Sequence, residues 1–377
     1  MPSAAKTWKI ALLHDTRIQG RGGHLTHLAF RGLPGVETVA LVDSNPDGIA
    51  ERLRETEAVR HYTTCEEMLD AETPDILVIC SRIPGEHLAP IGAAARKGVH
   101  VFCEKPLTID LREADRIVQL AEENRVRIAV AHLGRHALVF QTAKRMIEAG
   151  AIGRPLTFYG RGKEDARGGM EDMLVLGTHL LDLACFFFGP PESVFADISV
   201  NGRPLRREDR IATTEPLGPV AGDDVMAFYK FPDGVRGLFE SRKNLASRGV
   251  RMGLTIEGST GTLAVRYDED RKLRLSRSPF PPEDESRFDD VPLREERVIP
   301  GARPLDLDAL AGHHRYFAEN NRLAAWDLIR SIEENREPLA GARDARTVLE
   351  MIHGAWASQL TGRAVRLPLE DRRHPLE

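Results

Sequence analysis

Cysteine, long apolar runs and targeting features are scarce in this 377-residue chain. The spacing of its four cysteines is neither a zinc pattern nor a disulfide framework, so no metal site is expected and a reducing cytoplasm is the simplest location. The apolar segment that ends in FFFG (186–189) is far too short to span a bilayer, and the N-terminal segment lacks the apolar core of a signal peptide. We therefore expect no membrane partner.

The chain also lacks an excess of positive charge. Its formal net charge is -5, and acidic and basic residues are interspersed, which argues against a nucleic-acid partner. Apolar residues make up 42% of the chain, enough to fill a sizeable core. The length favours two domains rather than one.

In the first third of the chain, apolar strands alternate with helical patterns. The expected strands are 8–13, 36–43, 75–81, 99–104 and 126–132, and the expected helices are 23–32, 46–56, 85–98 and 110–125. The strands are continuous apolar runs, as expected when helices cover both faces of a sheet. Residues 1–132 are therefore predicted to form an α/β dinucleotide-binding domain with a doubly wound parallel sheet.

The pattern changes in residues 133–377, which are predicted to form an α+β domain with an open, mostly antiparallel sheet. Two helices, 137–150 and 175–189, precede segments whose turns at 232–234 and 258–261 indicate hairpins. Two long helices, 312–336 and 342–360, follow. An alternative is that these two helices pack back on the first domain.

The turn after the first strand is atypical. A dinucleotide-binding fingerprint would place a glycine directly after the strand, but His14 and Asp15 stand there. Gly20, Gly22 and Gly23 still allow a backbone to approach a pyrophosphate. We count these glycines and Asp15 as cofactor-binding candidates, although an ordinary strand–helix turn would have similar residues.

Asp43 ends the second strand, about twenty residues beyond the turn. A carboxylate there can accept hydrogen bonds from the adenosine ribose hydroxyls, or it can simply cap the following helix. Asp43 would repel the 2′-phosphate of NADP, and Ser44 and Asn45 provide no basic group to bind it. Arg52 and Arg54 lie deeper in the helix and are poor substitutes. The sequence therefore favours NAD over NADP.

The segment VHVFCEKPL, residues 99–107, places Glu104 and Lys105 at the end of a buried strand. Ligands of α/β sheets bind at this carboxyl edge. A lysine there can donate a hydrogen bond to a hydroxyl or carbonyl oxygen of a substrate. On spacing alone, the two residues could instead form a surface ion pair.

With the EKP motif, the chain resembles the glucose–fructose oxidoreductase / inositol dehydrogenase (Gfo/Idh/MocA) family. The resemblance also includes LVDSNPDGIAERL (41–53), GTHLLDL (177–183) and GDDVMAFYKFPDGVRGLFESR (222–242). It implies an N-terminal Rossmann domain and a C-terminal domain whose open sheet forms a homodimer or homotetramer. It also implies NAD(P)-dependent oxidation of a CH–OH group in a sugar, sugar acid or cyclitol.

The resemblance assigns roles to individual residues. Lys105 matches the family lysine that contacts the reacting oxygen and the nicotinamide ribose. His179 matches the catalytic histidine that accepts the hydroxyl proton, a role suited to an imidazole. Asp182 shares roughly the same helix face and is expected to orient His179 or a substrate group. Glu104, next to Lys105, is counted as cofactor-binding.

The sequence departs from the family at several positions. SRIPGEH (81–87) differs from the usual motif, although Ser81, Arg82 and His87 are still expected beside the cofactor. Many members place an aspartate four residues before the catalytic histidine, where this chain has Val175. Arg135 is expected near the substrate, as in other members.

A charged stretch, 160–172, precedes the His179 segment. Charge runs are usually solvated loops. Because this one adjoins His179, we favour the interpretation that it lines the substrate pocket. The substrate-contact candidates are Lys163, Glu164, Asp165, Arg167 and His179. The carboxylates that could replace the missing aspartate are Asp182, Glu164, Asp165, Glu171 and Asp172, and we favour Glu164 or Asp165 because residues 163–165 continue the preceding strand towards the cleft.

Two other functions remain open. Some relatives are redox glycosidases or lyases that oxidise a sugar transiently and return the hydride to a tightly held NAD. A non-catalytic sensor or assembly subunit that retains the fold is the second alternative, and Val175 together with the altered turn supports it.

Overall fold

The structure is a computed structural model. It describes residues 6–17, 24–214, 217–245, 252–267, 271–278, 285–293, 298–306, 310 and 312–377. The chain forms two compact units. The first consists of Met1–His136 and Arg297–Ala345, and the second of Ala137–Glu296 and Arg346–Glu377. The first unit is therefore assembled from two separate parts of the sequence.

The first unit contains a six-stranded parallel sheet, as the alternating pattern predicts. Its strand order is β3-β2-β1-β4-β5-β6. The strands are β1 Trp8–Leu13, β2 Val36–Val42, β3 Arg60–Tyr62, β4 Ile76–Ile79, β5 His100–Cys103 and β6 Ile128–Val130. The order reverses direction between β1 and β4, which is the switch point of a doubly wound fold.

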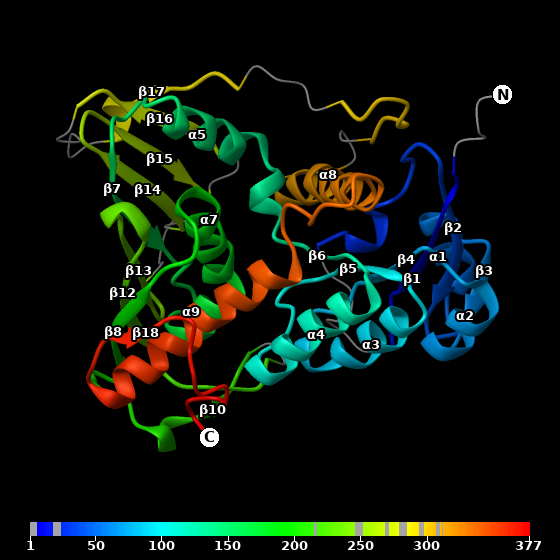
Figure 1. The fold of residues 1–377 in the computed structure, drawn as a ribbon, viewed down its shortest axis with the longest axis horizontal. Helices are drawn as coiled ribbons and strands as arrows, with labels where there is room; N and C mark the ends of the chain where they lie inside the picture. Colours follow the sequence, from blue (N-terminus) through cyan, green and yellow to red (C-terminus); the bar gives the residue numbers. More distant parts are fainter. Residues whose placement is uncertain are drawn as a thin grey trace. The chain divides into compact units, whose positions relative to one another are not determined.

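Helices cover both faces of this sheet, and Figure 1 shows α3 and α4 on one face and α8 on the other. The helices of the first unit are α1 Ile49–Thr56, α2 Cys65–Glu72, α3 Leu88–Arg96, α4 Leu111–Asn124 and α8 His313–Glu333. The start of α4 is capped by Asp110, whose carboxylate accepts hydrogen bonds from the backbone N–H groups of Arg112 and Glu113.

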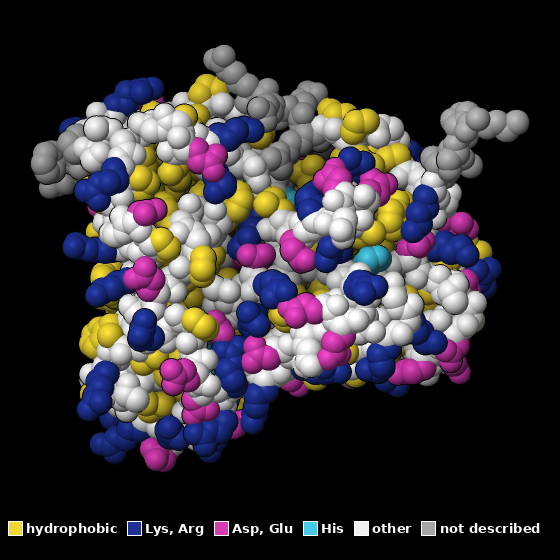
Figure 2. Space-filling view, in the orientation of Figure 1, with side chains coloured by type: hydrophobic (Ala, Val, Ile, Leu, Met, Phe, Trp, Pro, Cys, Tyr) yellow, Lys and Arg dark blue, Asp and Glu magenta, His cyan; other side chains and the backbone are white. Residues whose placement is uncertain are grey.

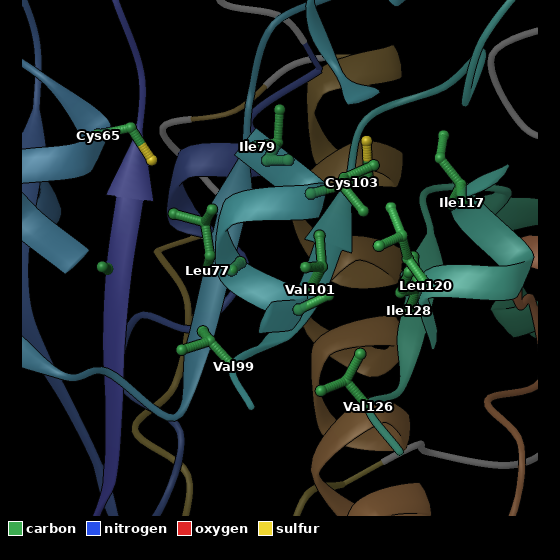
Figure 3. Packing of buried hydrophobic residues seen from close by; sticks show 14 of the residues in the cluster. Cys65, Leu77, Ile79, Val99, Val101, Cys103, Ile117, Leu120, Val126 and Ile128 are labelled. Atoms are coloured by element: carbon green, nitrogen blue, oxygen red, sulfur yellow. The ribbon is translucent and has the colours of Figure 1, made fainter. Parts of the chain in front are cut away.

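Alternate side chains of each strand enter two separate cores. Leu77 and Ile79 of β4 join one core with residues of α2, α3 and α4, while Ile76 and Val78 join the other with residues of α8. Figure 3 shows part of the first core, where Leu77 and Ile79 lie near Val101 and Cys103 of the neighbouring strand β5. Burial on both faces explains why the strands read as continuous apolar runs.

Local structure differs from the sequence expectation in three places. The helix predicted at 23–32 is wrong for the described part, which contains only the 3₁₀ turn η1, Thr26–Leu28. His24 and Leu25 have positive φ angles, which an α-helix does not allow. Strand β3 and helix α2 were not anticipated, because their short segments have weak apolar periodicity.

The second unit contains a ten-stranded sheet in which most neighbours are antiparallel, as predicted; β7 and β13 are parallel. Its strands are β7 Pro155–Arg161, β8 Ser193–Val200, β9 Arg203–Pro204, β12 Asp224–Lys230, β13 Arg236–Arg242, β14 Gly253–Gly258, β15 Thr262–Arg266, β16 Leu273–Ser276, β17 Asp289–Asp290 and β18 Val365–Arg366. The turns predicted at 232–234 and 258–261 join β12 to β13 and β14 to β15. A separate pair consists of β10 Ile211–Ala212 and β11 Pro219–Val220.

Helices α7 and α9 lie along one face of this sheet (Figure 1). The helical elements of the second unit are α5 Leu138–Glu148, α6 Met170–Asp172, the π-helical turn η4 Met173–Gly177, α7 Thr178–Phe188 and most of α9, Ala342–Thr361. The buried Tyr229 hydroxyl of β12 donates to the backbone oxygen of Met351 in α9.

The surface carries charges of both signs. Figure 2 shows Lys and Arg side chains interspersed with Asp and Glu side chains on the face that it draws. In the part of the chain that the structure describes, no helix is both long and apolar enough to cross a membrane.

The loop between β7 and α6 approaches strand β13 closely at Gly168. A Cβ atom at this position would lie 2.3 Å from the backbone oxygen of Arg242 and 2.3 Å from the Cα atom of Lys243. Real Cβ atoms do not approach other atoms so closely, and these neighbours are backbone atoms. Only glycine therefore fits without a shift of the loop or the strand.

Replacing Gly168 with Ala should lower the melting temperature measured by calorimetry. Overpacking costs about 1–3 kcal/mol, which corresponds to roughly 2–12 °C for a unit of this size. Gly85→Ala is the matched control, because a Cβ atom there meets nothing within 4 Å. Equal melting temperatures for the two variants would contradict the close approach.

Candidate cofactor and active site

Polar residues gather where the parallel strands of the first unit end. Asp15 follows β1, Asp43 follows β2, Ser81 lies two residues beyond β4, and Glu104 and Lys105 follow β5. Because parallel strands share one carboxyl edge, these residues line the same edge, beside the switch point between β1 and β4. Outside the described residues lie the predicted turn glycines, Gly20, Gly22 and Gly23.

Glu104 is almost completely buried and is held from two sides. Its Oε1 lies 2.7 Å from Nδ1 of His24, and its Oε2 accepts a hydrogen bond from the Thr26 hydroxyl. Burial alone raises the pKa of Glu104, but the electrostatic interactions with His24 and Lys105 and the hydrogen bonds from His24 and Thr26 outweigh it and lower the pKa. Glu104 is therefore an ionised carboxylate inside the protein.

Lys105 is also buried, with 3% of its surface exposed. Its charge lies close enough to Glu104 to lower the pKa of that carboxyl group. The alternative interpretation, a surface ion pair of Glu104 and Lys105, is therefore wrong, since neither side chain lies on the surface.

Asp43 is fully buried, and both of its oxygens are engaged. Oδ1 accepts from the backbone N–H groups of Thr16 and Asn45 at 3.0 and 2.9 Å, and Oδ2 accepts from the Thr16 hydroxyl at 2.8 Å. Asp43 thus ties the segment after β1 to the segment after β2. Asp43 does not cap α1. The residue at the N-cap position of that helix is Gly48, and no side chain caps the helix there.

The sequence treats Arg52 as a poor substitute for a basic group beside Asp43, because it lies deeper in the helix, but its side chain reaches Asp43. Its Nε lies 2.7 Å from Oδ2 of Asp43, and Nη1 and Nη2 donate to the backbone oxygens of Asp47 and Asn45. The Arg52 side chain folds back over the first turn of α1, a path that position along the helix does not reveal. Asp43 therefore has a basic partner.

Asp15 and the neighbouring histidine complete this corner. Asp15 accepts a hydrogen bond from the Ser44 hydroxyl at 2.7 Å. His14 stacks on His27 with ring centroids 4.5 Å apart. Burial and the nearby His27 lower the pKa of His14 to about 4, so its ring is neutral at neutral pH.

Beyond β4, Ser81 and His87 make contacts within the protein. The Ser81 hydroxyl accepts from the backbone N–H of Ile83 at 3.1 Å and donates to Glu86 at 3.2 Å. The fully buried His87 ring lies between the backbone oxygens of Ser81 and Leu107, at 2.8 and 2.9 Å. The His87 ring joins the loops after β4 and β5. Arg82 is half-buried.

Arg135, expected near the substrate, contacts the segment before α9. Its Nη1 donates to the backbone oxygen of Leu339 at 2.9 Å and lies 3.0 Å from Oδ1 of Asp344. These contacts hold the segment that leads into α9 within the first unit. A role in substrate binding stays a prediction.

In the second unit, the charged stretch 160–172 is mostly buried, which the interpretation as a solvated loop did not anticipate. Asp165 accepts from the backbone N–H of Arg167 at 2.9 Å and from its guanidinium at 2.7 Å, with Lys163 3.4 Å away. The hydrogen bonds from Arg167 lower the pKa of Asp165 to about 2. These ion pairs give the loop a fixed shape.

Two carboxyl groups of this stretch are fully buried, Glu164 and Asp172. Asp172 Oδ2 accepts from the Ser241 hydroxyl at 2.5 Å and from the backbone N–H of Glu164 at 3.1 Å. Burial raises the pKa of both groups, and the neighbouring Asp172 raises that of Glu164 further. The Glu171 carboxylate accepts a hydrogen bond from the backbone N–H of Thr214 at 2.7 Å.

His179 is the second residue of α7 and is half-buried. The π-helical turn η4 ends at Gly177, directly before α7 begins. Such turns are rare in proteins as a whole, but many of those known lie at functional sites. Gly177 permits this turn to pack on β13, because a Cβ atom there would lie 2.6 Å from the Phe239 ring. Asp182 and Val175 are both buried.

The carboxyl edge of the first unit fits a dinucleotide in its donor and acceptor set. Asp15, after β1, and Ser44, after β2, are partly exposed and joined by a hydrogen bond. In doubly wound folds the ribose of a bound dinucleotide lies at the end of the second strand. Lys105 provides an ammonium group at the end of β5.

Sequence reasoning missed several residues of this edge, including Thr16, His24, Arg52 and Asn321. Asn321 of α8 donates from Nδ2 to the backbone oxygen of His24 at 2.6 Å, and the His24 ring packs on Phe317. Arg52 was noted and set aside. The other three carry no motif, and a separation of 297 residues hides the contact between Asn321 and His24.

Two family models match the chain. The "Oxidoreductase family, NAD-binding Rossmann fold" matches residues 19–132, and the "GFO/IDH/MocA C-terminal domain" matches residues 140–264. Together the matches cover more than half of the chain.

Several curated relatives are named as sugar or polyol dehydrogenases. The chain is 28% identical over 264 residues to levoglucosan dehydrogenase of Pseudarthrobacter phenanthrenivorans, a match covering 63% of this chain and 66% of the relative. It is 28% identical to D-apiose dehydrogenase of Paraburkholderia graminis, covering 64% of each chain. The chain thus spans under two thirds of these two relatives. Myo-inositol 2-dehydrogenase of Thermotoga maritima is 23% identical, covering 87% of this chain and 90% of the relative.

Solved structures share the fold along nearly the whole chain. Levoglucosan dehydrogenase in complex with NADH and levoglucosan superposes with a TM-score of 0.72 at 20% identity, covering 96% of this chain and 100% of that one. An NAD-binding oxidoreductase from Klebsiella pneumoniae gives 0.74 at 22% identity, covering 97% and 100%. Sheet order, matched models and shared fold agree: the chain belongs to the Gfo/Idh/MocA oxidoreductase family.

Proposed function

We propose that this chain is an NAD-dependent oxidoreductase that acts on a CH–OH group of a sugar, sugar acid or cyclitol. The observation that carries the proposal is the buried Lys105 beside the ionised Glu104 at the carboxyl edge of the parallel sheet. The relatives named as levoglucosan, D-apiose and myo-inositol dehydrogenases support the substrate class.

A bound nicotinamide dinucleotide would supply the hydride acceptor or donor. We propose that residues at the ends of β1, β2, β4 and β5 hold it, with Asp15, Ser81 and Lys105 among them. The buried His87 fixes the backbone of two of these loops through its two carbonyl contacts. NAD is the proposed cofactor, and selectivity against NADP depends on the environment of Asp43.

We propose that Lys105 donates a hydrogen bond to the substrate oxygen. The neighbouring Glu104 carboxylate favours the charged ammonium, because an opposite charge nearby stabilises it. His24 and Thr26 hold that carboxylate in place, so the lysine is positioned before substrate arrives. Such pre-organised donors act most strongly where water is excluded.

We propose that His179 accepts the hydroxyl proton during oxidation and returns it during reduction. His179 lies in the first turn of α7, which follows the π-helical turn η4. Asp182, buried on the same helix, is the proposed orienting residue. Val175 cannot orient His179, because it has no ionisable group. The loop that contains the buried Glu164 and Asp172 leads through α6 directly into η4, so it is proposed to hold η4 in place.

Replacing Lys105 with Met should lower kcat/KM by about a hundred- to a thousandfold, the effect of losing one oxyanion donor. Lys97→Met is the matched control, since Lys97 is exposed and pairs with Asp70 on the surface. A panel of sugars and polyols with NAD, monitored by absorbance of the reduced nicotinamide, measures the activity.

If Lys105 and His179 act in the same step, the double variant Lys105→Met with His179→Gln should lose less than the product of the single losses. Multiplicative losses would contradict a joint role. Cleavage of a glycoside without net reduction of NAD would identify the redox glycosidase instead. Calorimetry that detects no dinucleotide binding would favour the non-catalytic sensor.

Asp172 generates a prediction about stability and pH. Its pKa is raised in the folded protein, so its contribution to stability is present at low pH and is lost as pH rises above the ordinary value of 3.8. Asp172→Asn cannot lose a proton, yet it keeps an acceptor for Ser241. Relative to the native protein, the free energy of unfolding of this variant should therefore increase as pH rises through that region.

The matched control is Asp165→Asn, for which the opposite sign is expected. The pKa of Asp165 is lowered to about 2, so its contribution is present above 3.8 and is lost as pH falls towards 2. Denaturant titrations at a series of pH values measure both differences. The same pH trend in the two variants would refute the burial argument for Asp172.

We also propose that the sheet of the second unit pairs two copies of the chain. On the face away from α7 and α9, four residues form one cross-strand row: Phe195, Phe228, Leu238 and Tyr159. Phe195 and Tyr159 are 47% and 41% exposed. A shallow groove of about 650 Å³ beside this row also contains Met226 and the ion pair of Arg161 with Glu240. An apolar row rimmed by charges is typical of an interface.

Replacing Leu238 with Glu should shift the molecular mass in solution towards that of the monomer, because a charge would be buried in the paired face. Light scattering after size-exclusion chromatography measures the mass. Val59→Glu is the control, since Val59 is 57% exposed but lies in the first unit. A monomeric native protein, or no change for Leu238→Glu, would contradict the proposed pairing.

A further inference from the structure

Strand β13 contacts the π-helical turn η4 at both of its ends. Ser241 and Phe239 are two residues apart on β13, so their side chains point to the same face of the sheet, and both are fully buried. The Ser241 hydroxyl donates to Asp172, the residue directly before η4, at 2.5 Å. The Phe239 ring packs on Gly177, the last residue of η4, where a Cβ atom would lie 2.6 Å from the ring. The turn therefore has a hydrogen bond at its start and a steric contact at its end.

The Ser241 hydroxyl is engaged both as acceptor and as donor. Its oxygen accepts a hydrogen bond from the backbone N–H of Gly169 at 3.1 Å. Because that group can only donate, the single hydroxyl proton goes to Oδ2 of Asp172. Oδ2 also accepts from the backbone N–H of Glu164, whereas Oδ1 is buried without a hydrogen-bond partner among the residues that the structure describes. Ser241 is thus one of the groups that anchor the Asp172 side chain through a single oxygen.

The contact between Ser241 and Asp172 is closely packed. A Cβ atom at Gly162 would overlap with Oδ2 of Asp172 and would lie 2.7 Å from the Ser241 hydroxyl oxygen. The backbone N–H of Gly162 in turn donates to the backbone oxygen of Glu240, the neighbour of Ser241 in β13. A hydrogen bond in such a place is costly to lose, because the partner that remains stays buried.

The form of η4 decides where the side chains of α7 point. A π-helical turn contains one residue more between hydrogen-bonded groups than an α-helical turn. If η4 relaxed to an α-helix, the residues after it would rotate about the helix axis by about 100° relative to α6, the angle that one residue covers at 3.6 residues per turn. His179 is the second residue of α7. The direction of its imidazole therefore depends on keeping η4 π-helical.

We propose that Ser241 is a positioning residue for His179: its hydroxyl, through Asp172, keeps η4 π-helical and so sets the direction of the imidazole. The proposal rests on the proposed function, because it assigns the proton transfer to His179. It requires no charge on Asp172, since a protonated carboxyl group also keeps an acceptor oxygen for the hydroxyl.

Kinetics with NAD and an accepted sugar or polyol test this role. Ser241→Ala should lower kcat/KM by about ten- to a hundredfold, the effect of a small displacement of a catalytic group. The dissociation constant of NADH should not change, because the proposed dinucleotide site lies in the first unit. When His179 is already replaced with Gln, Ser241→Ala should cause no further loss of kcat/KM, because Ser241 acts through His179.

Ser358→Ala is the matched control. The Ser358 hydroxyl is also buried, accepts from the backbone N–H of Ala196 at 3.0 Å and donates to the backbone oxygen of Arg363 at 2.7 Å, but it lies on α9. This variant loses the same kinds of hydrogen bond and should keep the native kcat/KM. Circular dichroism and melting temperature check that both variants are folded.

Two variants of Asp172 test the same contact from its other side. Asp172→Ala removes the acceptor and should lower kcat/KM as much as Ser241→Ala. Asp172→Asn keeps an acceptor oxygen and should lose much less. If Asn is as harmful as Ala, the charge of Asp172 matters rather than its contact with Ser241, and the inference is wrong.

Hydrogen exchange measured by mass spectrometry tests the contact without any turnover. Peptides that cover residues 173–178 should exchange about tenfold faster in Ser241→Ala than in the native protein, and at the native rate in Ser358→Ala. Unchanged exchange and unchanged kcat/KM in folded Ser241→Ala, or an equal loss of kcat/KM with and without His179, would overturn the positioning role. If the native protein oxidises none of the substrates, or if His179→Gln is fully active, the proposed function fails, and hydrogen exchange still decides whether Ser241 holds η4.

Discussion

The carboxyl edge of the parallel sheet depends on the compensation of one buried charge, that of Glu104. An isolated carboxylate in the interior would cost several kcal/mol, so its partners must be held in place. His24 and Thr26 are two of these partners, and Lys105 is the third. Because His24 and Thr26 lie between β1 and β2, this segment and strand β5 are joined through this carboxylate.

Helix α8 extends the same dependence to a distant part of the chain. Asn321 holds the backbone oxygen of His24, and Phe317 packs on the His24 ring. The helix also supplies Leu328 and Ile329 to the core on its face of the sheet. A substitution in α8 would therefore affect the segment around His24 through these contacts as well as through the core.

The two units treat buried carboxylates differently. In the first, Glu104 and Asp43 have cationic partners, and the pKa of Glu104 is lowered. In the second, Glu164 and Asp172 lie close together in the interior, and their pKa values are raised. In the sequence, all four are simply Asp or Glu residues. Only the surroundings decide which remain charged and which tend to keep a proton.

The sequence by itself determined the architecture and the positions of the chemistry on it. Continuous apolar runs required a sheet covered on both faces, and the motif at 104–106 placed a lysine at a strand end. Tertiary structure decided the rest, because the partners of charged groups come from distant segments. It placed Arg52 on Asp43, buried the loop 160–172, shortened the predicted helix after the first strand to η1, and brought Asn321 to His24. Strand and helix periodicity is a local property, whereas the pairing and burial of charges depend on how the chain folds back on itself.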